Sequence, residues 1–282
     1  MARYSDEDDQ RVIESDQQKD TFLTMKLDDQ VRLRLCSVRS QESQLENLPN
    51  QDFVRVVSTP SKASLSFCVC DGVGGSYLGN FAARYLAIRL TSRLQSLPAF
   101  PSDLRQIATS LHKELATWAA EGQQDLLYGG LPSSLVGLER EIIEEQRDHY
   151  GSATVFFGGR IDYAQEEGSP AGAAGTMQTL FCWMGNITAL AYIESTYQRL
   201  GDWQNDRNRW STLRGSQGDF TTYITTLSRN DPLIIHTDGL EKLSDELAAL
   251  DESQLQERIQ HLLQQPTSDD MTFLELCWSD DE

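Results

Sequence analysis

The chain has 282 residues, 39% of them hydrophobic, and its 43 acidic against 24 basic residues give a formal net charge of −19. This length and hydrophobic content suffice for one large core or for two small domains. The acidity argues against generic binding to nucleic acids or to anionic membranes, since both are polyanions. It fits either a surface charge that maintains solubility or carboxylates clustered to hold cations, and composition does not separate the two.

The N-terminus and the cysteines indicate a cytoplasmic protein. The first twenty residues are polar and lack the apolar segment of a secretory signal, and no run of about 18 apolar residues could span a membrane. The five cysteines show no C-x-x-C spacing, which excludes the common zinc and redox motifs. Buried, reduced thiols are the expected state of such cysteines in the cytosol.

The first part of the chain is predicted to be mostly strands. Residues 1–20 are expected to be a solvated acidic tail or a weakly ordered start. Residues 41–50 are predicted to be a polar loop. Alternating, β-branched or continuous apolar residues predict a pair of strands over 21–38 and single strands at 53–57 and 65–70.

Helices are predicted next, followed by many strands. Helical spacing of apolar residues predicts helices at 81–95, at 102–119 with Ser102 or Asp103 as N-cap, around 138–146, and at 244–265 with Ser244 as N-cap. Strands are predicted at 152–163, 179–194, 221–227, 232–236 and 271–278. Helices and strands are segregated along the chain, which favours an α+β fold over a doubly wound parallel sheet.

Aspartates stand at the ends of three of these apolar strands. Asp71 follows one strand, Asp238 follows another, and Asp269 and Asp270 precede the last. Carboxylates that meet at strand ends repel one another unless protons or a cation intervene. Because no histidine or cysteine accompanies them, the hard oxygen donors favour Mg²⁺ or Mn²⁺. The alternative is that each aspartate only starts a turn, since Asp-Gly is a common turn dipeptide.

A glycine-rich segment follows Asp71 but matches neither common phosphate-binding motif. Gly72 and Gly74 begin a G-x-G-x-x-G pattern whose third glycine is missing. A P-loop would need a lysine where Asn80 stands. The segment is therefore interpreted as a loop whose backbone passes close to a neighbouring group.

Six short motifs follow one another along roughly residues 30–280: NQDF (50–53), FCVCDGVGG (67–75), GSATVFF (151–157), WMGNITALAYI (183–193), DPLIIHTDGL (231–240) and SDDMTFLEL (268–276). Together they resemble the motifs of the metal-dependent protein serine/threonine phosphatases of type 2C, in their bacterial form. The resemblance implies a single domain over residues 21–282, a four-layer α-β-β-α sandwich of two antiparallel sheets flanked by helices. This architecture agrees with the segregated order of elements.

The resemblance also implies an activity: hydrolysis of phosphoserine and phosphothreonine in proteins, opposing a serine/threonine kinase. The nucleophile would be a water or hydroxide bridging two divalent cations, Mg²⁺ or Mn²⁺. No protein nucleophile is needed in such a mechanism. Ser76, Ser152 and His236 are therefore predicted to be structural.

The metal ligands follow from the same resemblance. Asp71 would bridge both ions, and the carbonyl of Gly72 would bind one of them. Asp238 and Asp269 would complete the other. These three aspartates would act in catalysis through the bridging water.

Residues around these ligands match the family less closely. Asp52 would hold metal-bound water, and Gln51 stands where many members carry a glutamate ligand. Val73 occupies the position of a histidine found in eukaryotic members, which fits a bacterial lineage. Asn186 replaces an aspartate of a third metal site, so such a site is not expected here.

The largest departure concerns the substrate phosphate. Asn47 stands where the family often has an arginine that clamps the phosphate, and only Arg39 or Arg55 could replace it nearby. Residues 199–219 form a divergent, flap-like excursion that would set substrate preference.

Three functions remain open. The first is an active phosphoprotein phosphatase. The second is a catalytically weak or inactive module of the same fold that binds phosphoprotein partners. The third is a hydrolase of small phosphate esters.

Overall fold

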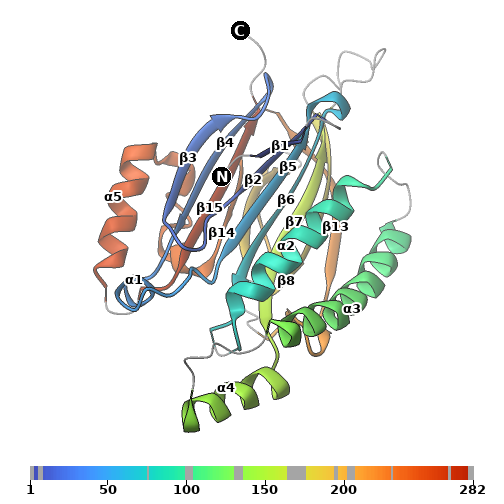
Figure 1. Cartoon of the computed structure of the whole chain (residues 1–282). Coiled ribbons are helices and arrows are strands. Elements are labelled where there is room, and N and C mark those ends of the chain that lie inside the picture. The colour runs from blue at the N-terminus through green and yellow to red at the C-terminus, as the bar shows by residue number, and fades with distance from the viewer. Residues whose placement is uncertain are drawn as a thin grey trace.

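A large curled antiparallel sheet with a few helices forms the protein, as Figure 1 shows. The structure is a computed structural model and describes residues 3–5, 9–74, 76–98, 104–129, 136–163, 176–193, 196–201, 207–229, 231–265 and 268–278. Its strands are β1 (Arg3–Ser5), β2 (Gln10–Glu14), β3 (Thr21–Lys26), β4 (Val31–Val38), β5 (Phe53–Thr59), β6 (Ser64–Gly72), β7 (Ala153–Asp162), β8 (Thr176–Met184), β9 (Thr188–Ile193), β10 (Thr196–Leu200), β11 (Arg209–Ser211), β12 (Gly215–Gln217), β13 (Thr221–Ser228), β14 (Leu233–His236) and β15 (Met271–Trp278).

These strands form one hydrogen-bonded path rather than two separate sheets. The order is β1-β2-β5-β6-β7-β8-β13-β9-β14-β15-β4-β3, with β10, β11 and β12 attached to its side. β13 pairs with β8 along its whole length but with β9 only at Leu227 and Ile193. The ladder is therefore continuous but narrow at this point, where it bends back on itself.

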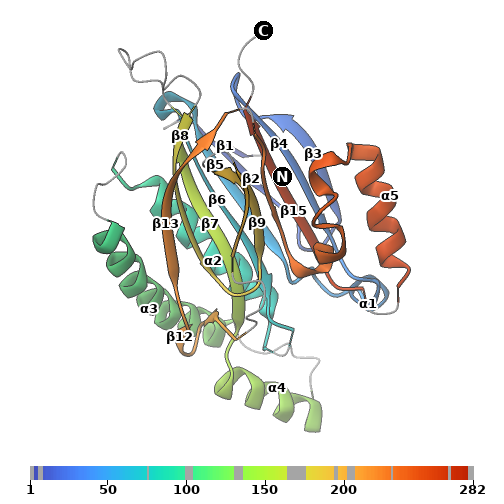
Figure 2. The ribbon, with the colours of Figure 1, turned by 180° about the vertical axis from the view of Figure 1, so that it is seen from behind.

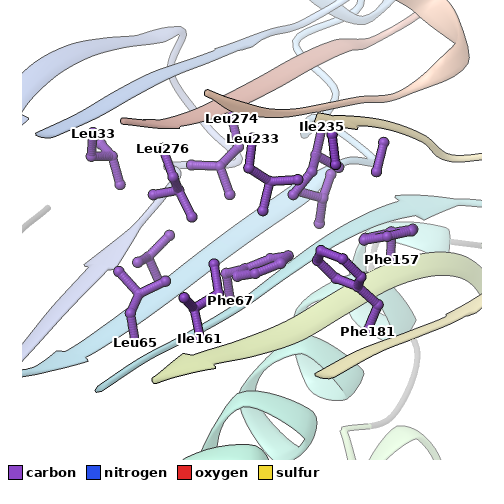
Figure 3. Close-up of a cluster of buried hydrophobic side chains, with 14 of the residues drawn as sticks. Leu33, Leu65, Phe67, Phe157, Ile161, Phe181, Leu233, Ile235, Leu274 and Leu276 are labelled. Carbon is purple, nitrogen blue, oxygen red and sulfur yellow. The ribbon is translucent and has the colours of Figure 1, made fainter. Parts of the chain in front are cut away.

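The two stretches of sheet on either side of this bend face each other across the main hydrophobic core (Figure 3). In Figure 3, Leu65, Phe67 and Phe157 on one stretch point toward Leu233 and Leu274 on the other. Alternation along each strand sends every second side chain into this core. Aromatic contacts add to it: the ring centroids of Phe157 and Phe181 lie 5.4 Å apart.

Helices cover the outer faces of the sheet. α2 (Gly79–Gln95) packs on β5, β6 and β7, and α3 (Leu104–Tyr128) packs against α2, β12 and β13, over a second cluster that includes Phe53, Leu86 and Phe156. α5 (Glu252–Leu263) and the short helix η2 (Asp238–Leu243) pack on β4, β14 and β15 over a third. Figures 1 and 2 show α5 on one side of the sheet, α2 and α3 on the other, and α4 (Gly137–His149) projecting at one end.

Two segments differ from the sequence-based predictions near the N-terminus. Part of the expected acidic tail is strand β2, which pairs with β5 and buries Ile13. The polar segment 41–50 contains the one-turn helix α1 (Gln41–Leu45), because the hydroxyl of Ser40 accepts a hydrogen bond from the backbone N–H of Ser43.

The predicted helix 244–265 is shorter than expected, and its predicted N-cap is wrong. Helix α5 begins after Asp251, which forms a capping box with Gln254, and a short 3₁₀ turn, η3 (Leu247–Ala249), precedes it. Ser244 is not the N-cap of α5: it ends the preceding helix η2, and its hydroxyl hydrogen-bonds to His236 instead. The predicted caps Ser102 and Asp103 lie outside the described residues.

The expectation of reduced, mostly buried cysteines is confirmed. All five cysteines are free, and only Cys277 is partly exposed. Cys68 and Cys70 point to the same face of β6, with their sulfur atoms 3.4 Å apart. In the described part of the chain, no helix is both long and apolar enough to cross a bilayer.

Replacing Phe67 by alanine should lower the free energy of unfolding by about 3–5 kcal/mol, because a cavity would form in the core. Phe67 is 0% exposed and contacts Phe181 edge-on. The control is Phe22→Ala on the edge strand β3, since Phe22 is 36% exposed. Chemical denaturation measures both variants, and equal effects would contradict the assignment of Phe67 to the core.

Candidate metal centre

Five aspartates from separate segments converge at one end of the sheet. Asp52 directly precedes β5, Asp71 is the penultimate residue of β6, Asp238 begins η2 after β14, and Asp269 and Asp270 precede β15. Burial raises the pKa of Asp71 well above its usual value, and the charges of the other four aspartates raise it further. The five carboxylates therefore lie within electrostatic reach of one another.

Strand register brings them together. β5 and β6 are antiparallel with Phe53 opposite Cys70, so the residue before β5 lies beside the end of β6. β14 and β15 are antiparallel with His236 opposite Phe273, so the residues after β14 lie beside those before β15. Each antiparallel pair thus delivers carboxylates to the same edge from two distant parts of the sequence.

The carboxylates form an inner and an outer group. Asp52 and Asp270 are 1% and 5% exposed, whereas Asp71 is half-buried and Asp238 and Asp269 lie at the surface with their carboxyl groups still partly desolvated. The three aspartates that the sequence predicts as metal ligands are therefore the three that reach solvent.

Hydrogen bonds hold the inner pair in place. The carboxylate of Asp270 accepts from the backbone N–H groups of Ser40 and Gln51, both at 2.6 Å. Asp52 accepts from the hydroxyl of Thr237 at 2.8 Å. Burial and the charge of Asp270 nevertheless raise the pKa of Asp52 well above its usual value. These buried acids have partners but no neutralising cation among the described side chains.

The outer group is held more loosely. Asp238 Oδ2 accepts from Asn186 Nδ2 at 3.0 Å, and Asp269 Oδ1 accepts from the backbone N–H of Asp270 at 2.8 Å. Burial raises the pKa of Asp238, while the amide of Asn186 opposes the shift. Burial and the charge of Asp238 raise the pKa of Asp269. Asn186 therefore directly contacts a predicted ligand.

Close backbone packing surrounds Gly72. Its N–H donates to the carbonyl of Gln51 at 3.2 Å, and a Cβ at this position would lie 2.5 Å from the carbonyl carbon of Gly79. The side chain of Gln51 is directed toward Gly79, since a Cβ there would lie 2.8 Å from Gln51 Oε1. Gly72 therefore lets the end of β6 meet the start of α2.

The donor set fits a divalent cation in its chemistry. The converging groups are all hard oxygen donors, and their mutual repulsion would be relieved by a cation. Within the described residues, however, no three His, Cys, Asp or Glu side chains are close enough to enclose one ion as they stand. The centre therefore has suitable ligand atoms, but these side chains do not form a complete coordination site as they stand.

Two residues that the sequence does not single out, Gln17 and Asp270, hold the backbone around this centre. Gln17, inside the expected tail, donates through Nε2 to the carbonyls of Asn50, Asp52 and Asn80, at 3.1, 3.3 and 3.1 Å. Asp270 was noted only as a neighbour of Asp269. The adjacent pair Asp269-Asp270 is the sequence feature that could have pointed to it. No feature of the sequence points to Gln17.

His236 is structural, as predicted. It is fully buried, its Nδ1 hydrogen-bonds to the carbonyl of Thr237, and its Nε2 to the hydroxyl of Ser244, both at 2.9 Å. The carbonyl can only accept, so Nδ1 carries the proton and Nε2 accepts from the hydroxyl. Burial lowers the pKa of His236, which keeps the ring neutral.

The two predicted structural serines also fix the backbone. Ser152 Oγ donates to the carbonyl of Leu78 and accepts from the N–H of Ala82 at 3.0 Å. Ser76 Oγ donates to the carbonyl of Val73 at 2.7 Å. Both hydroxyls are used in holding the loop between β6 and α2.

The phosphate clamp missing from the sequence is not replaced by its expected neighbours. Asn47 lies exposed after α1 with a positive φ of 54°. Arg39 forms an ion pair with Asp20, and Arg55 forms one with Glu14. Both arginines are therefore already engaged.

Solved structures of bacterial phosphatases share this architecture. Serine/threonine phosphatase Stp1 from Staphylococcus aureus superposes with a TM-score of 0.58 at 13% identity, covering 91% of this chain and 98% of that protein. The protein has the fold of the bacterial serine/threonine phosphatases. No protein-family profile and no curated protein matches the sequence itself.

Two further structures of this fold contain metals. RsbX in complex with magnesium superposes with a TM-score of 0.54 at 15% identity, covering 92% of this chain and 100% of that protein. The catalytic domain of the phosphatase PstP, with two manganese ions, gives 0.51 at 15% identity, covering 89% and 99%. The resemblance predicted from the short motifs is thus confirmed for the fold.

Metal-free protein should lose stability as the pH rises from about 4 toward 8. Folding raises the pKa of Asp52, Asp71, Asp238 and Asp269. A group with a raised pKa stabilises the fold fully below its unfolded pKa, and this stabilisation is lost as the pH rises through the folded value. Thermal melting in EDTA, repeated across this pH range, measures how the melting temperature changes with pH.

Two comparisons isolate the centre from the general effect of net charge. Asp71→Asn should flatten the dependence of the melting temperature on pH. Asp29→Asn, at an exposed turn residue, should leave this dependence unchanged. Added Mn²⁺ should raise the melting temperature more at high pH, because a cation binds deprotonated carboxylates. The same pH dependence of the melting temperature in the wild type, Asp71→Asn and Asp29→Asn would contradict the convergence of charge at Asp71.

Gly72→Ala should destabilise the protein by about 1–3 kcal/mol, because its Cβ would overlap the backbone of α2. Gly74 is a matched control in the same loop, since a Cβ there would meet nothing within 4 Å. Denaturant unfolding distinguishes them. A Gly74→Ala variant as unstable as Gly72→Ala would show that loop flexibility, not close packing, matters here.

Proposed function

We propose that the protein is a metal-dependent phosphatase acting on phosphoserine and phosphothreonine in proteins. The observation that supports this best is that Asp71, Asp238 and Asp269 reach solvent beside two buried aspartates, on a phosphatase fold. Folding alone does not require five carboxylates to meet, and their repulsion costs stability. An arrangement of this kind is typical of functional sites.

The residues that would hold the cations are those predicted from the sequence. The carboxylates of Asp71, Asp238 and Asp269, together with the backbone carbonyl of Gly72, would hold two ions. RsbX with magnesium and PstP with two manganese ions support Mg²⁺ or Mn²⁺ for this chain. When bound, such ions supply an activated water nucleophile and neutralise charge on the phosphoryl oxygens.

The chain's own residues would prepare this chemistry. Asn186 orients Asp238 by its amide hydrogen bond. Thr237 holds the carboxylate of Asp52 and is itself held by the N–H of Thr272 at 3.0 Å. Held in this way, Asp52 would accept hydrogen bonds from metal-bound water. No side chain is required as a covalent nucleophile.

The finer architecture belongs to the same proposal. Three hydrophobic clusters lie between successive layers. The first lies between helices α2 and α3 and one stretch of sheet, the second between the two stretches of sheet, and the third between the other stretch and α5. This succession supports a four-layer α-β-β-α sandwich, with residues 21–282 as one domain and β2 added to it. The substrate would be a phosphoprotein, in line with the serine/threonine phosphatases Stp1 and PstP. The activity would oppose that of a serine/threonine kinase.

Two observations favour a second function, a binding module for phosphoproteins with little or no turnover. The described side chains do not enclose an ion, and the phosphate clamp is replaced by Asn47. Such a module would bind phosphopeptides without releasing phosphate.

Phosphate release from a phosphothreonine peptide tests the proposal. We expect turnover with Mn²⁺ or Mg²⁺, none in EDTA, and a loss of about 100-fold or more in Asp238→Ala, because removing charge stabilisation at a reacting group costs this much. Asp245→Ala, an exposed aspartate seven residues further along, is the control and should remain active. No turnover with either metal from folded protein would favour the binding module.

A further inference from the structure

A pocket of about 230 Å³ opens next to the candidate metal centre. Arg209 and Arg214, from the hairpin of β11 and β12, line it together with Val73 and Ser76 of the loop that follows Asp71. Figure 2 shows β12 at the end of the sheet beside α3. The pocket therefore has one wall in common with the candidate centre.

Its two arginines have no acidic partner in the part of the chain that the structure describes. Among the described residues, neither guanidinium forms an ion pair or a hydrogen bond, whereas arginines such as Arg34, Arg93 and Arg160 do. The chain as a whole carries a net charge of −19. Two unpaired cations lining one pocket of so acidic a protein form a local site of opposite charge, which points to an anionic ligand.

The register of three strands places the pocket relative to the centre. Thr154 on β7 pairs with Gly72 of β6 on one side and with Trp210 of β11 on the other. Because adjacent strands are about 4.8 Å apart, the backbone of β11 lies about 10 Å from Gly72. The Thr154 hydroxyl also donates to the carbonyl of Asp71 at 2.7 Å, which ties the two sites together.

The hairpin that carries the arginines is firmly held. Trp210 is fully buried, and its Nε1 donates to the carbonyl of Leu115 in α3 at 2.9 Å. Ser211 Oγ accepts from the backbone N–H of Arg214 at 3.1 Å and from the side chain of Gln217 at 3.0 Å. The backbone is thus fixed before any ligand binds, which lowers the entropic cost of binding.

We propose that Arg209 and Arg214 form a substrate-recognition site for an anionic side chain, a carboxylate or a second phosphate, beside the phosphoresidue being hydrolysed. This proposal rests on the proposed phosphatase function. An extended peptide advances about 3.3 Å per residue, so about 10 Å corresponds to roughly three residues. The guanidinium fork matches both carboxylate and phosphate.

The scissile phosphoryl group itself is a poorer candidate for this pocket. It must lie over Asp71, Asp238 and Asp269, at the ends of β6 and β14, while the arginines lie two strands away. The acidic surface would otherwise repel an acidic peptide, so the pocket would determine whether such a substrate is accepted.

Kinetics on three phosphothreonine peptides test the proposal. They carry alanine, glutamate or phosphoserine three residues from the phosphothreonine, on either side. For Arg209→Gln and Arg214→Gln we expect KM to rise by about 10-fold or more for the glutamate and phosphoserine peptides, the effect of losing a hydrogen bond to a charged group. KM for the alanine peptide, and kcat for all three, should stay unchanged.

Arg258→Gln is the control, because Arg258 is an exposed arginine on α5. Arg209→Lys should restore part of the preference, since the charge remains but the fork is lost. Comparing KM for the glutamate peptide with KM for the phosphoserine peptide shows which anion is preferred. An equal loss for all peptides and for a small ester such as p-nitrophenyl phosphate would overturn the proposal, as would unchanged KM values.

Binding measured without turnover separates this proposal from the proposed function. Fluorescence anisotropy of the same labelled peptides is recorded on full-length protein in EDTA. If phosphate is never released but acidic peptides bind more tightly in an Arg209- and Arg214-dependent manner, the site stands and phosphatase activity fails. If phosphate is released but the arginine variants change neither binding nor KM, the recognition site fails and the phosphatase stands.

Discussion

Burial of one hydrophobic cluster between two stretches of a single antiparallel sheet is the interaction on which the other features depend. The stretch carrying Phe67 and the stretch carrying Leu274 are joined only narrowly, through Leu227 and Ile193 of β13 and β9. Side-chain packing, rather than backbone pairing, therefore holds them face to face. Once they are held so, the edges at which β6 and β14 end are brought to the same place.

That edge works against stability. Five aspartates gather there, and burial together with mutual repulsion raises the pKa of Asp52 and Asp71. Backbone N–H groups and the hydroxyl of Thr237 stabilise the buried pair but leave the outer three facing solvent. The fold thus tolerates a cost at one end, as is common at functional sites. The nearby arginine pair, Arg209 and Arg214, adds the opposite charge beside it.

Several elements could be predicted from local patterns because their signals are local. Apolar alternation or continuity located the strands around residues 21–38 and 65–70, and helical spacing located α2, α3 and α4. The start of α5 was misplaced because Ser244 uses its hydroxyl for His236, a partner that no local rule reveals. Strand β2 was missed because its polar sequence gains burial only by pairing with β5.

The sequence by itself determined the kinds of residues available: three acidic strand ends, Gly72, and a set of motifs that resemble those of a phosphatase family. Only the tertiary structure decided which of them meet. Strand register placed Asp270 and Thr237 under the candidate ligands, and pairing of β11 with β7 carried Arg209 to within two strands of Gly72. The reason is physical: charge, hydrogen bonding and burial act between residues close in space, and the distances along the chain between these partners carry no information about that proximity.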